Sequence, residues 1–149
     1  MQTIPDFELP STGGNFRLSS QGGKYLLLYF YPKDNTPGCT TESQQFRDLN
    51  EEFRKLGCAV FGISRDSIKS HDNFKAKFSL PFDLLSDGSE AVCTLFGVIK
   101  QKMMYGKAVR GIERSTFLID AKRTILKEWR GVKADGHAEA VLNFLKTLS

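Results

Sequence analysis

The chain has 149 residues, 40% of them hydrophobic, and a formal net charge of +4. This length is usual for one domain and allows a buried core without disulfide staples, so we expect a single domain over residues 1–149. No window holds the roughly eighteen apolar residues that a membrane helix needs. The N-terminus lacks the basic-then-apolar pattern of a signal peptide. We therefore expect a mature cytoplasmic protein with no membrane partner.

The cysteines and the charges exclude further classes of protein. Cys39, Cys58 and Cys93 are an odd, sparse set, which is a poor disulfide framework for a secreted domain. No CxxC or CxxH pair exists and the two histidines are far apart, so we expect no metal site. Acidic and basic residues alternate almost everywhere except in the basic stretch KQKMMYGKAVRGIER. A modest excess of lysine is usually a solvated surface, so we expect no nucleic-acid partner.

The first part of the chain predicts two short strands and then a buried one. Residues 4–20 surround the turn STGGN, as a small β-hairpin would. Residues 25–31 are seven consecutive apolar residues, which indicates a strand buried on both faces, as in a parallel sheet. Pro32 ends that strand because proline cannot donate a ladder hydrogen bond.

A long helix follows, and the rest of the chain alternates strands with helices. Four apolar residues spaced 3, 4 and 3 apart predict an amphipathic helix over 37–56, ended by Gly57: Phe46, Leu49, Phe53 and Leu56. The remainder predicts a strand at 58–64, a helix at 67–78, a short strand in FDLLSD, a short helix in SEAVCTLFGV, a hairpin of RSTFLID with TILKEWRG, and a helix at 136–148 with Ala138, Val141, Leu142, Leu145 and Leu148 inward. This order predicts an α/β fold, with a mixed central sheet flanked by helices and an N-terminal β-hairpin.

Other residues are assigned by their neighbours. His71 and His137 stand beside polar residues on predicted helices, so we place both on the surface. Trp129 alternates with Lys127 and Ile125 in the predicted hairpin, so we place it in the core. The basic residues 100–114 have two interpretations: a solvated flexible loop, or a surface that helps to dock a partner.

The start of the helix at 37–56 places a thiol where it can ionise. Thr36 is a favoured N-cap residue and Pro37 a favoured first helical residue, so Cys39 is the third residue of the helix. Free N–H groups and the positive end of the helix dipole stabilise a thiolate there, and such a position lowers a cysteine pKa from about 8.5 to roughly 3.5–7.5. Gly38 leaves room for a group to approach the backbone. The alternative interpretation is that Cys39 is a small buried hydrophobe.

These residues carry a resemblance to a known family. YFYPKDNTPGCTTE resembles the peroxiredoxin signature of a proline, a threonine and the peroxidatic cysteine, here Pro32, Thr36 and Cys39. GIERSTFLID resembles a later segment of that family, whose arginine would be Arg114. The order of elements along nearly the whole chain resembles the family's thioredoxin-like fold. The short chain with TPGCTTE and RSTFLID is most similar to the bacterioferritin comigratory protein (PrxQ) branch.

The resemblance implies a mechanism. The Cys39 thiolate would attack a hydroperoxide and become a sulfenic acid. Thr36 would hydrogen-bond the peroxide and the thiolate, Arg114 would keep Cys39 ionised and polarise the O–O bond, and Pro32 would shield the thiolate from water. Glu42 would orient the arginine; alternatively it is a first-turn acid that complements the helix dipole. No metal or organic cofactor is implied.

The sequence departs from its relatives in the resolving thiol. Where many members of the branch carry a second cysteine, this chain has Gln44 on the same helix and Lys75 on the next one. Cys58 lies beyond the far end of a helix that spans about 25 Å, whereas a disulfide needs Cα atoms within about 7 Å. We expect Cys93 to be a core residue, which makes it a weak candidate for the resolving thiol. We therefore expect a one-cysteine mechanism in which thioredoxin, glutaredoxin or glutathione reduces the sulfenic acid.

Three other functions are weighed against the thiol peroxidase. A thiol–disulfide oxidoreductase would need a CxxC pair, but Glu42 occupies the second position. A non-enzymatic binding module would use the basic surface, and a peroxide sensor would pass the oxidation of Cys39 to a partner. The branch consists commonly of monomers, so we expect a monomer.

Overall fold

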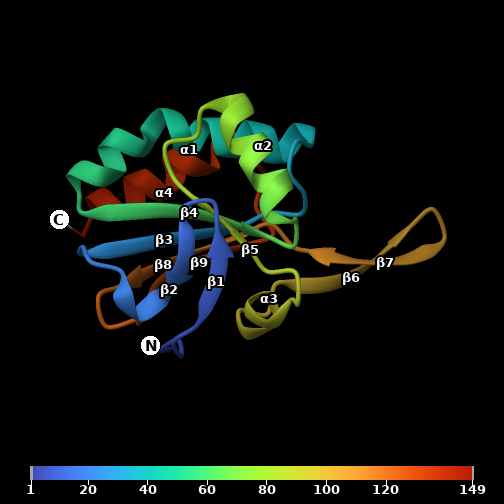
Figure 1. The fold of residues 1–149 in the computed structure, drawn as a ribbon, viewed down its shortest axis with the longest axis horizontal. Coiled ribbons are helices and arrows are strands. Elements are labelled where there is room, and N and C mark those ends of the chain that lie inside the picture. Colours follow the sequence, from blue (N-terminus) through green and yellow to red (C-terminus); the bar gives the residue numbers. More distant parts are fainter. Residues whose placement is uncertain (1, 149) are drawn as a thin grey trace.

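The computed structural model describes residues 2–148, apart from the side chains of residues 102 and 104. Seven strands form one mixed sheet in the spatial order β2–β1–β5–β4–β3–β8–β9 (Figure 1). Their bounds are β1 Glu8–Ser11, β2 Gly14–Arg17, β3 Tyr25–Phe30, β4 Cys58–Ser64, β5 Leu84–Ser86, β8 Ser115–Asp120 and β9 Ile125–Arg130. A separate two-stranded sheet consists of β6 Ile99–Met104 and β7 Lys107–Ile112.

The pairing of the strands follows the sequence pattern. Strands β3, β4 and β5 are parallel neighbours at the centre, which explains why β3 is apolar on both faces. Strand β8 runs antiparallel to β3 and forms a hairpin with β9. Strands β1 and β2 form the N-terminal hairpin and join the sheet through β5. The prediction of an α/β fold with a mixed sheet and an N-terminal hairpin is confirmed.

The helices cover both faces of the sheet. They are α1 Pro37–Lys55, α2 Ile68–Phe78, α3 Ala91–Leu95 and α4 His137–Lys146, with a 3-10 turn η1 at Leu18–Ser20. Figure 1 shows α1, α2 and α4 above the sheet and α3 below it. The predicted helix at 136–148 thus ends at Lys146, and Leu148 lies beyond it and is exposed, contrary to its predicted inward position.

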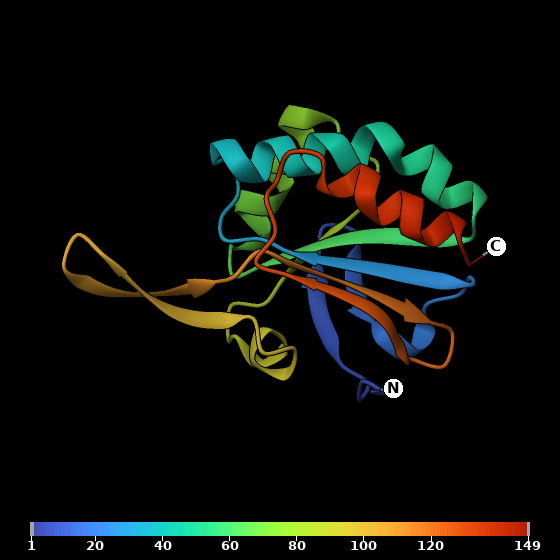
Figure 2. The same ribbon diagram turned by 180° about the vertical axis from the view of Figure 1, so that it is seen from behind.

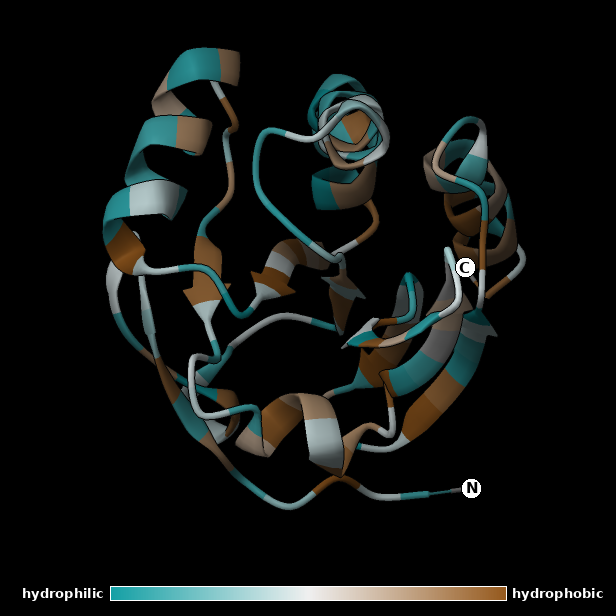
Figure 3. Ribbon diagram, turned by 90° about the vertical axis from the view of Figure 1, so that its right-hand side faces the viewer, coloured by the Kyte–Doolittle hydropathy of each residue, from teal (hydrophilic) through white to brown (hydrophobic). Residues whose placement is uncertain are grey.

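Two hydrophobic cores lie back to back across β3. Leu27, Tyr29 and Tyr31 point toward α1, α2 and α4, while Leu26, Leu28 and Phe30 point toward α3 and the N-terminal strands. In Figure 3 hydrophobic segments run along the strands between the helices. The helices themselves show hydrophobic and hydrophilic bands, as expected for elements buried on one side (Figure 3). Trp129 packs against the first core, as predicted.

Residues 99–112 correct one prediction. The flexible loop expected over 100–114 is wrong, because β6 and β7 form an antiparallel hairpin that projects from the body of the protein (Figure 2). The alternative of a docking surface stays a prediction. Tyr105 and Gly106 at its tip both have positive φ, as two-residue hairpin turns require. Because the described side chains beyond its base, from Lys100 to Arg110, are exposed, its sequence lacks the alternation that marks a half-buried strand. Glu90 ties the hairpin to the body through ion pairs with Arg65 and Arg110.

Both histidines correct a second prediction, because they are buried rather than on the surface. His71 lies three residues before Phe74 on the inner face of α2, and His137 lies four before Val141 on the inner face of α4. Asp72 and Glu139, two of their polar neighbours, are exposed, so the spacing to the apolar residues was the informative signal.

The core side of β4 has no room for a side chain at Gly62. A Cβ atom there would lie 2.8 Å from Tyr29 Cζ and 2.9 Å from Leu84 Cδ2. We expect Gly62→Ala to lower the free energy of unfolding by about 1–3 kcal/mol, measured by urea denaturation. Gly88→Ala is the control, because no atom lies within 4 Å of its added Cβ. Equal stability of the two variants would contradict this packing argument.

Candidate active site

The turn between β3 and α1 places Cys39 as the sequence predicts. Thr36 has the extended conformation of an N-cap residue, with φ −98° and ψ 155°, and Pro37 is the first helical residue. The backbone N–H of Thr40 donates to the Thr36 carbonyl at 2.8 Å. The Thr36 hydroxyl does not cap the helix, however, because it donates to the Lys33 carbonyl at 2.8 Å. Cys39 is therefore the third residue of α1, at the carboxyl end of a central parallel strand.

Arg114 reaches Cys39 from a distant part of the chain. It lies between β7 and β8, and its Nη2 is 3.6 Å from Cys39 Sγ. The side chain of Cys39 is buried, with 1% of the residue exposed. A guanidinium at this distance stabilises a thiolate by charge and by hydrogen bonding. The free N–H groups of the first helical turn add a positive potential at this end of α1.

Glu42 holds the other side of the same guanidinium. Arg114 Nη1 donates to Glu42 Oε1 at 2.7 Å. The carboxyl group is fully buried, and this burial raises its pKa to about 7, against the opposing effect of the Arg114 charge. Its second oxygen, Oε2, has no hydrogen-bond partner among the described residues. Glu42 lies in the second turn of α1 and faces Arg114, so the structure does not place it as a first-turn acid.

The segment 131–136 closes the site from the α4 side. A Cβ on Gly38 would lie 3.1 Å from Arg114 Nη2 and 3.9 Å from the Cβ of Ala134, so a larger residue would displace the guanidinium by a few tenths of an ångström. Gln45 holds this segment, since its Nε2 donates to Asp135 Oδ1 at 2.7 Å and its Oε1 accepts from the Gly136 N–H at 2.9 Å. Sequence reasoning missed Ala134 and Gln45, which no motif marks.

Pro32 and the remaining thiols are also placed by the structure. Pro32 lies in the turn before α1 and is partly buried. Cys58 opens β4 opposite Tyr25, at the other end of the sheet, and burial raises its pKa to about 12. Cys93 belongs to the core on the opposite face of the sheet from Cys39. Burial, with the nearby Asp87 carboxylate, raises the pKa of Cys93 far above its ordinary value. All three cysteines are free thiols.

Two buried polar clusters flank this site. His137 Nε2 lies 2.8 Å from Thr116 Oγ1, and burial together with the charge of Arg114 lowers the pKa of His137 to about 4. On the α2 side, the ligand-type atoms of Asp34, Asp66 and His71 lie within 4.8 Å of one another. The carboxylate oxygens of this second cluster already accept hydrogen bonds from protein hydroxyl groups.

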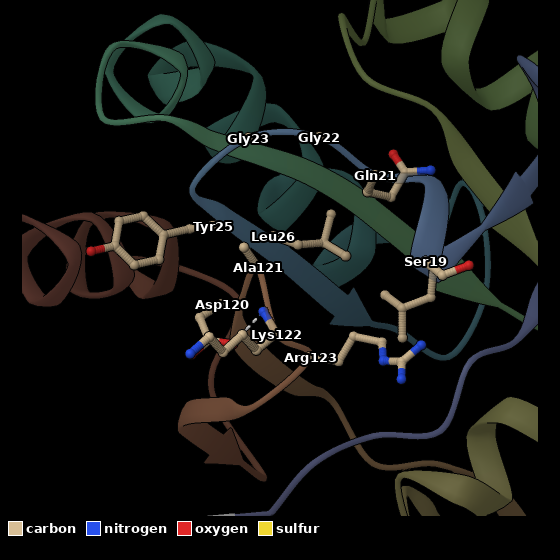
Figure 4. A pocket seen from close by; sticks show the side chains of 11 residues that line it. Ser19, Gln21, Gly22, Gly23, Tyr25, Leu26, Asp120, Ala121, Lys122 and Arg123 are labelled. Carbon is tan, nitrogen blue, oxygen red and sulfur yellow. Dashed lines mark hydrogen bonds between the residues drawn. The ribbon is translucent and has the colours of Figure 1, made fainter.

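A polar cavity of about 210 Å³ lies at the other end of the sheet (Figure 4). It is lined by residues of the 3-10 turn, the first residues of β3 and the turn after β8, among them Ser19, Tyr25 and Arg123. Tyr25 begins β3, whereas the turn that leads to Cys39 follows the end of β3. This cavity is therefore separate from the thiol site. The described part of the chain contains no helix long and apolar enough to cross a bilayer.

Comparison with known proteins agrees with this geometry. Residues 1–128 match the family model "AhpC/TSA family". Peroxiredoxin Bcp of Xanthomonas campestris is 54% identical over 143 residues, covering 94% of this chain and 89% of that protein. Peroxiredoxin Bcp of Bacillus subtilis is 48% identical over 149 residues, covering 99% of this chain and 95% of that one. A solved structure of the X. campestris bacterioferritin comigratory protein superimposes with a TM-score of 0.90 at 52% identity, covering 95% of this chain and 91% of that one.

The fold and the thiol site define a thioredoxin-fold peroxidase that depends on a cysteine. The chain belongs to the AhpC/TSA family, and within it to the peroxiredoxins of the Bcp (PrxQ) branch. Its substrates are accordingly a hydroperoxide and a thiol reductant. Family membership favours this activity over the non-enzymatic binding module and the thiol–disulfide oxidoreductase considered above.

The close approach of Gly38 to Arg114 can be tested by adding one methyl group. Gly38→Ala replaces a glycine in the first turn of α1, where alanine is at least as favourable for the helix, so the variant should still fold. The new Cβ should push the guanidinium from Cys39 and slow its oxidation by hydrogen peroxide about tenfold, measured by stopped flow. Gly22→Ala, whose Cβ would meet no atom within 4 Å, is the control. An unchanged rate in Gly38→Ala would contradict this description of the site.

Burial of Glu42 predicts a specific pH dependence of stability. Its pKa of about 7 in the folded protein lies above the ordinary 4.5, so the folded state binds an extra proton between these values. The contribution of Glu42 to the free energy of unfolding is therefore greatest below pH 4.5 and is lost as the pH rises through 7. Between pH 5 and 8, the stability of wild type relative to Glu42→Gln should fall by roughly 2–3 kcal/mol in urea denaturation. The opposite effect of His137 is common to both proteins and cancels, and parallel curves would contradict the prediction.

Proposed function

We propose that Cys39 is the peroxidatic cysteine of a one-cysteine peroxidase. The observation that carries this proposal is the 3.6 Å contact between Arg114 Nη2 and Cys39 Sγ at the first turn of α1. Among the described residues no arginine donates a hydrogen bond to Cys58 or Cys93. Burial raises the pKa of both thiols, so neither forms a thiolate readily. The substrates include hydrogen peroxide and organic hydroperoxides; the solved X. campestris relative is described as reducing alkyl peroxides.

The first step oxidises the sulfur by two electrons. The Cys39 thiolate attacks the terminal oxygen of the hydroperoxide, an S–O bond forms, and the O–O bond breaks. Cys39 becomes a sulfenic acid, and the leaving water or alcohol oxygen takes a proton. Arg114 stabilises the thiolate and the negative charge that develops on the departing oxygen. Glu42 acts through Arg114, because its carboxyl group contacts the guanidinium and not the sulfur.

Three residues of the approach to Cys39 have supporting roles. Gly38 leaves the space that the Arg114 guanidinium occupies. Pro32 precedes Thr36 in the turn and shields the thiolate from water. Thr36 presents its hydroxyl to the peroxide after exchanging its present bond to the Lys33 carbonyl, which lies 2.8 Å away. Exchange of one hydrogen bond for another of similar strength costs little.

An outside thiol completes the cycle. That thiol attacks the sulfenic sulfur, an S–S bond forms and water leaves; a second thiol then cleaves the mixed disulfide and releases the Cys39 thiolate. Cys93 cannot reach Cys39 without a large rearrangement, because the two thiols belong to cores on opposite faces of the sheet. Glutathione, glutaredoxin or thioredoxin supplies the external thiol. The protein acts as a cytoplasmic monomer.

One mass measurement separates this mechanism from its alternative. Intact mass is recorded after one equivalent of hydrogen peroxide, with and without dimedone, for wild type, Cys39→Ser and Cys93→Ser. We expect a dimedone adduct on wild type and on Cys93→Ser, and none on Cys39→Ser, because only Cys39 forms a sulfenic acid. A rapid loss of two hydrogens that Cys93→Ser abolishes would instead establish Cys93 as the resolving thiol.

A further inference from the structure

Helix α2 holds the turn that leads from β3 into the thiol site. Asp34, in the middle of this turn, is 7% exposed. Its Oδ1 accepts a hydrogen bond of 2.5 Å from the Tyr31 hydroxyl, and its Oδ2 accepts one of 2.8 Å from Ser70 Oγ on α2. The same Oδ2 lies 2.7 Å from His71 Nδ1 on α2. One buried carboxyl group therefore joins the turn to two consecutive residues of the helix.

The ring of His71 is fixed at both ends. His71 is fully buried, and its Nε2 lies 2.9 Å from the carbonyl oxygen of Leu85 in β5. A carbonyl oxygen only accepts, so Nε2 carries a proton, and the short contact between Nδ1 and Asp34 Oδ2 needs a second one. Both hydrogen bonds together set the ring orientation. His71 thus spans the distance from the central sheet to the turn.

Two more side chains hold the turn. The backbone N–H of Asp34 donates to Asp66 Oδ2 at 2.9 Å, and Lys77 Nζ on α2 donates to Asn35 Oδ1 at 3.1 Å. Asn35 has φ +59°, a left-handed conformation that asparagine adopts more readily than most residues. These contacts place the turn by side chains from α2 and from the end of β4.

The outer side of the turn has open space. A cavity of about 390 Å³ lies between the turn and α2, lined by Asp34 and Asn35 of the turn and by residues of α2 such as Ser70 and Lys77. Without the contact between Asp34 and His71, the turn can move into this space. A displacement of about 1 Å in a positioning segment is enough to slow a reaction about 100-fold.

We propose that Asp34 and His71 are positioning residues for the peroxidase reaction. They hold residues 32–36 so that Pro32 and Thr36 lie beside Cys39, and neither of them touches the peroxide. This proposal rests on the roles given above to Pro32 and Thr36. It predicts that the rate of oxidation depends on the buried hydrogen bond between the turn and α2, and not only on the stability of the fold.

The test compares two reactions of the same thiol. Oxidation of Cys39 by hydrogen peroxide needs the positioned turn, whereas alkylation by iodoacetamide needs only an accessible thiolate. We expect Asp34→Ala and His71→Leu to slow oxidation at least tenfold and to leave the alkylation rate at or above that of wild type. Asp34→Asn should stay within about threefold of wild type in both reactions, because a carboxamide can accept from Tyr31 and its two N–H groups can donate to His71 Nδ1 and to Ser70 Oγ, which reverses the Ser70 bond.

Leu145→Ala is the matched control for stability. Leu145 is fully buried near the C-terminal end of α4, so its truncation should lower Tm without slowing oxidation. If Asp34→Ala does not fold, Tyr31→Phe removes the donor to Asp34 Oδ1 and the 3.4 Å contact with His71 Nδ1, and leaves the contact between Asp34 and His71 in place. This variant should slow oxidation about twofold to fivefold.

Three outcomes would overturn the proposal. The first is an unchanged oxidation rate in Asp34→Ala and His71→Leu, and the second is a rate in Asp34→Asn as low as that in Asp34→Ala. The third is a fall in oxidation rate that follows the fall in Tm and that Leu145→Ala reproduces. A wild-type protein whose Cys39 forms no sulfenic acid would instead contradict the proposed function. The wild-type arm therefore separates the two claims.

Discussion

The contact of one guanidinium with both a thiol and a buried carboxyl group is the interaction on which the rest of the site depends. Arg114 lies 3.6 Å from Cys39 Sγ and 2.7 Å from Glu42 Oε1. Cys39 and Glu42 are buried, and only 16% of the Arg114 side chain is exposed. In such surroundings charges act strongly, and an unpaired one is costly. Glu42 and Cys39 lie one turn apart on α1, so a single cation can serve both. The fold brings this cation from residue 114 because β3 and β8 are neighbours.

The two-faced sheet decides what this thiol can react with. Cys39 lies in the core that β3 shares with α1, α2 and α4, and Cys93 lies in the core on the other face. Cys58 is at the opposite end of the sheet, beside Tyr25. The seven residues of β4 alone span about 20 Å, beyond the reach of a disulfide. Cys39 is thus the one of the three free thiols that lies at the site. Because neither of the others is placed to form a disulfide with it, an outside thiol is the simplest reductant for its sulfenic acid.

Sequence reasoning was strongest where the pattern was local. The apolar run 25–31, the N-cap at Thr36 and the position of Cys39 in the first turn of α1 were all predicted from neighbouring residues. It failed where burial depends on partners distant in sequence. His71 and His137 were predicted to lie on the surface, yet His71 lies within hydrogen-bond distance of Asp34 and of the Leu85 carbonyl, and His137 of Thr116. The hairpin β6–β7 was missed because its exposed strands show no alternation. Gln45 and Ala134 belong to the site only through tertiary contacts.

The account makes Glu42 dependent on Arg114, and a double-mutant cycle tests that dependence most directly. The second-order rate constant for oxidation of Cys39 by hydrogen peroxide would be measured by stopped flow for wild type, Arg114→Gln, Glu42→Gln and the double variant. If Glu42 acts only through Arg114, the double variant should be no slower than Arg114→Gln alone. Losses that multiply, as for two independent groups, would contradict the central claim that one shared cation organises the site.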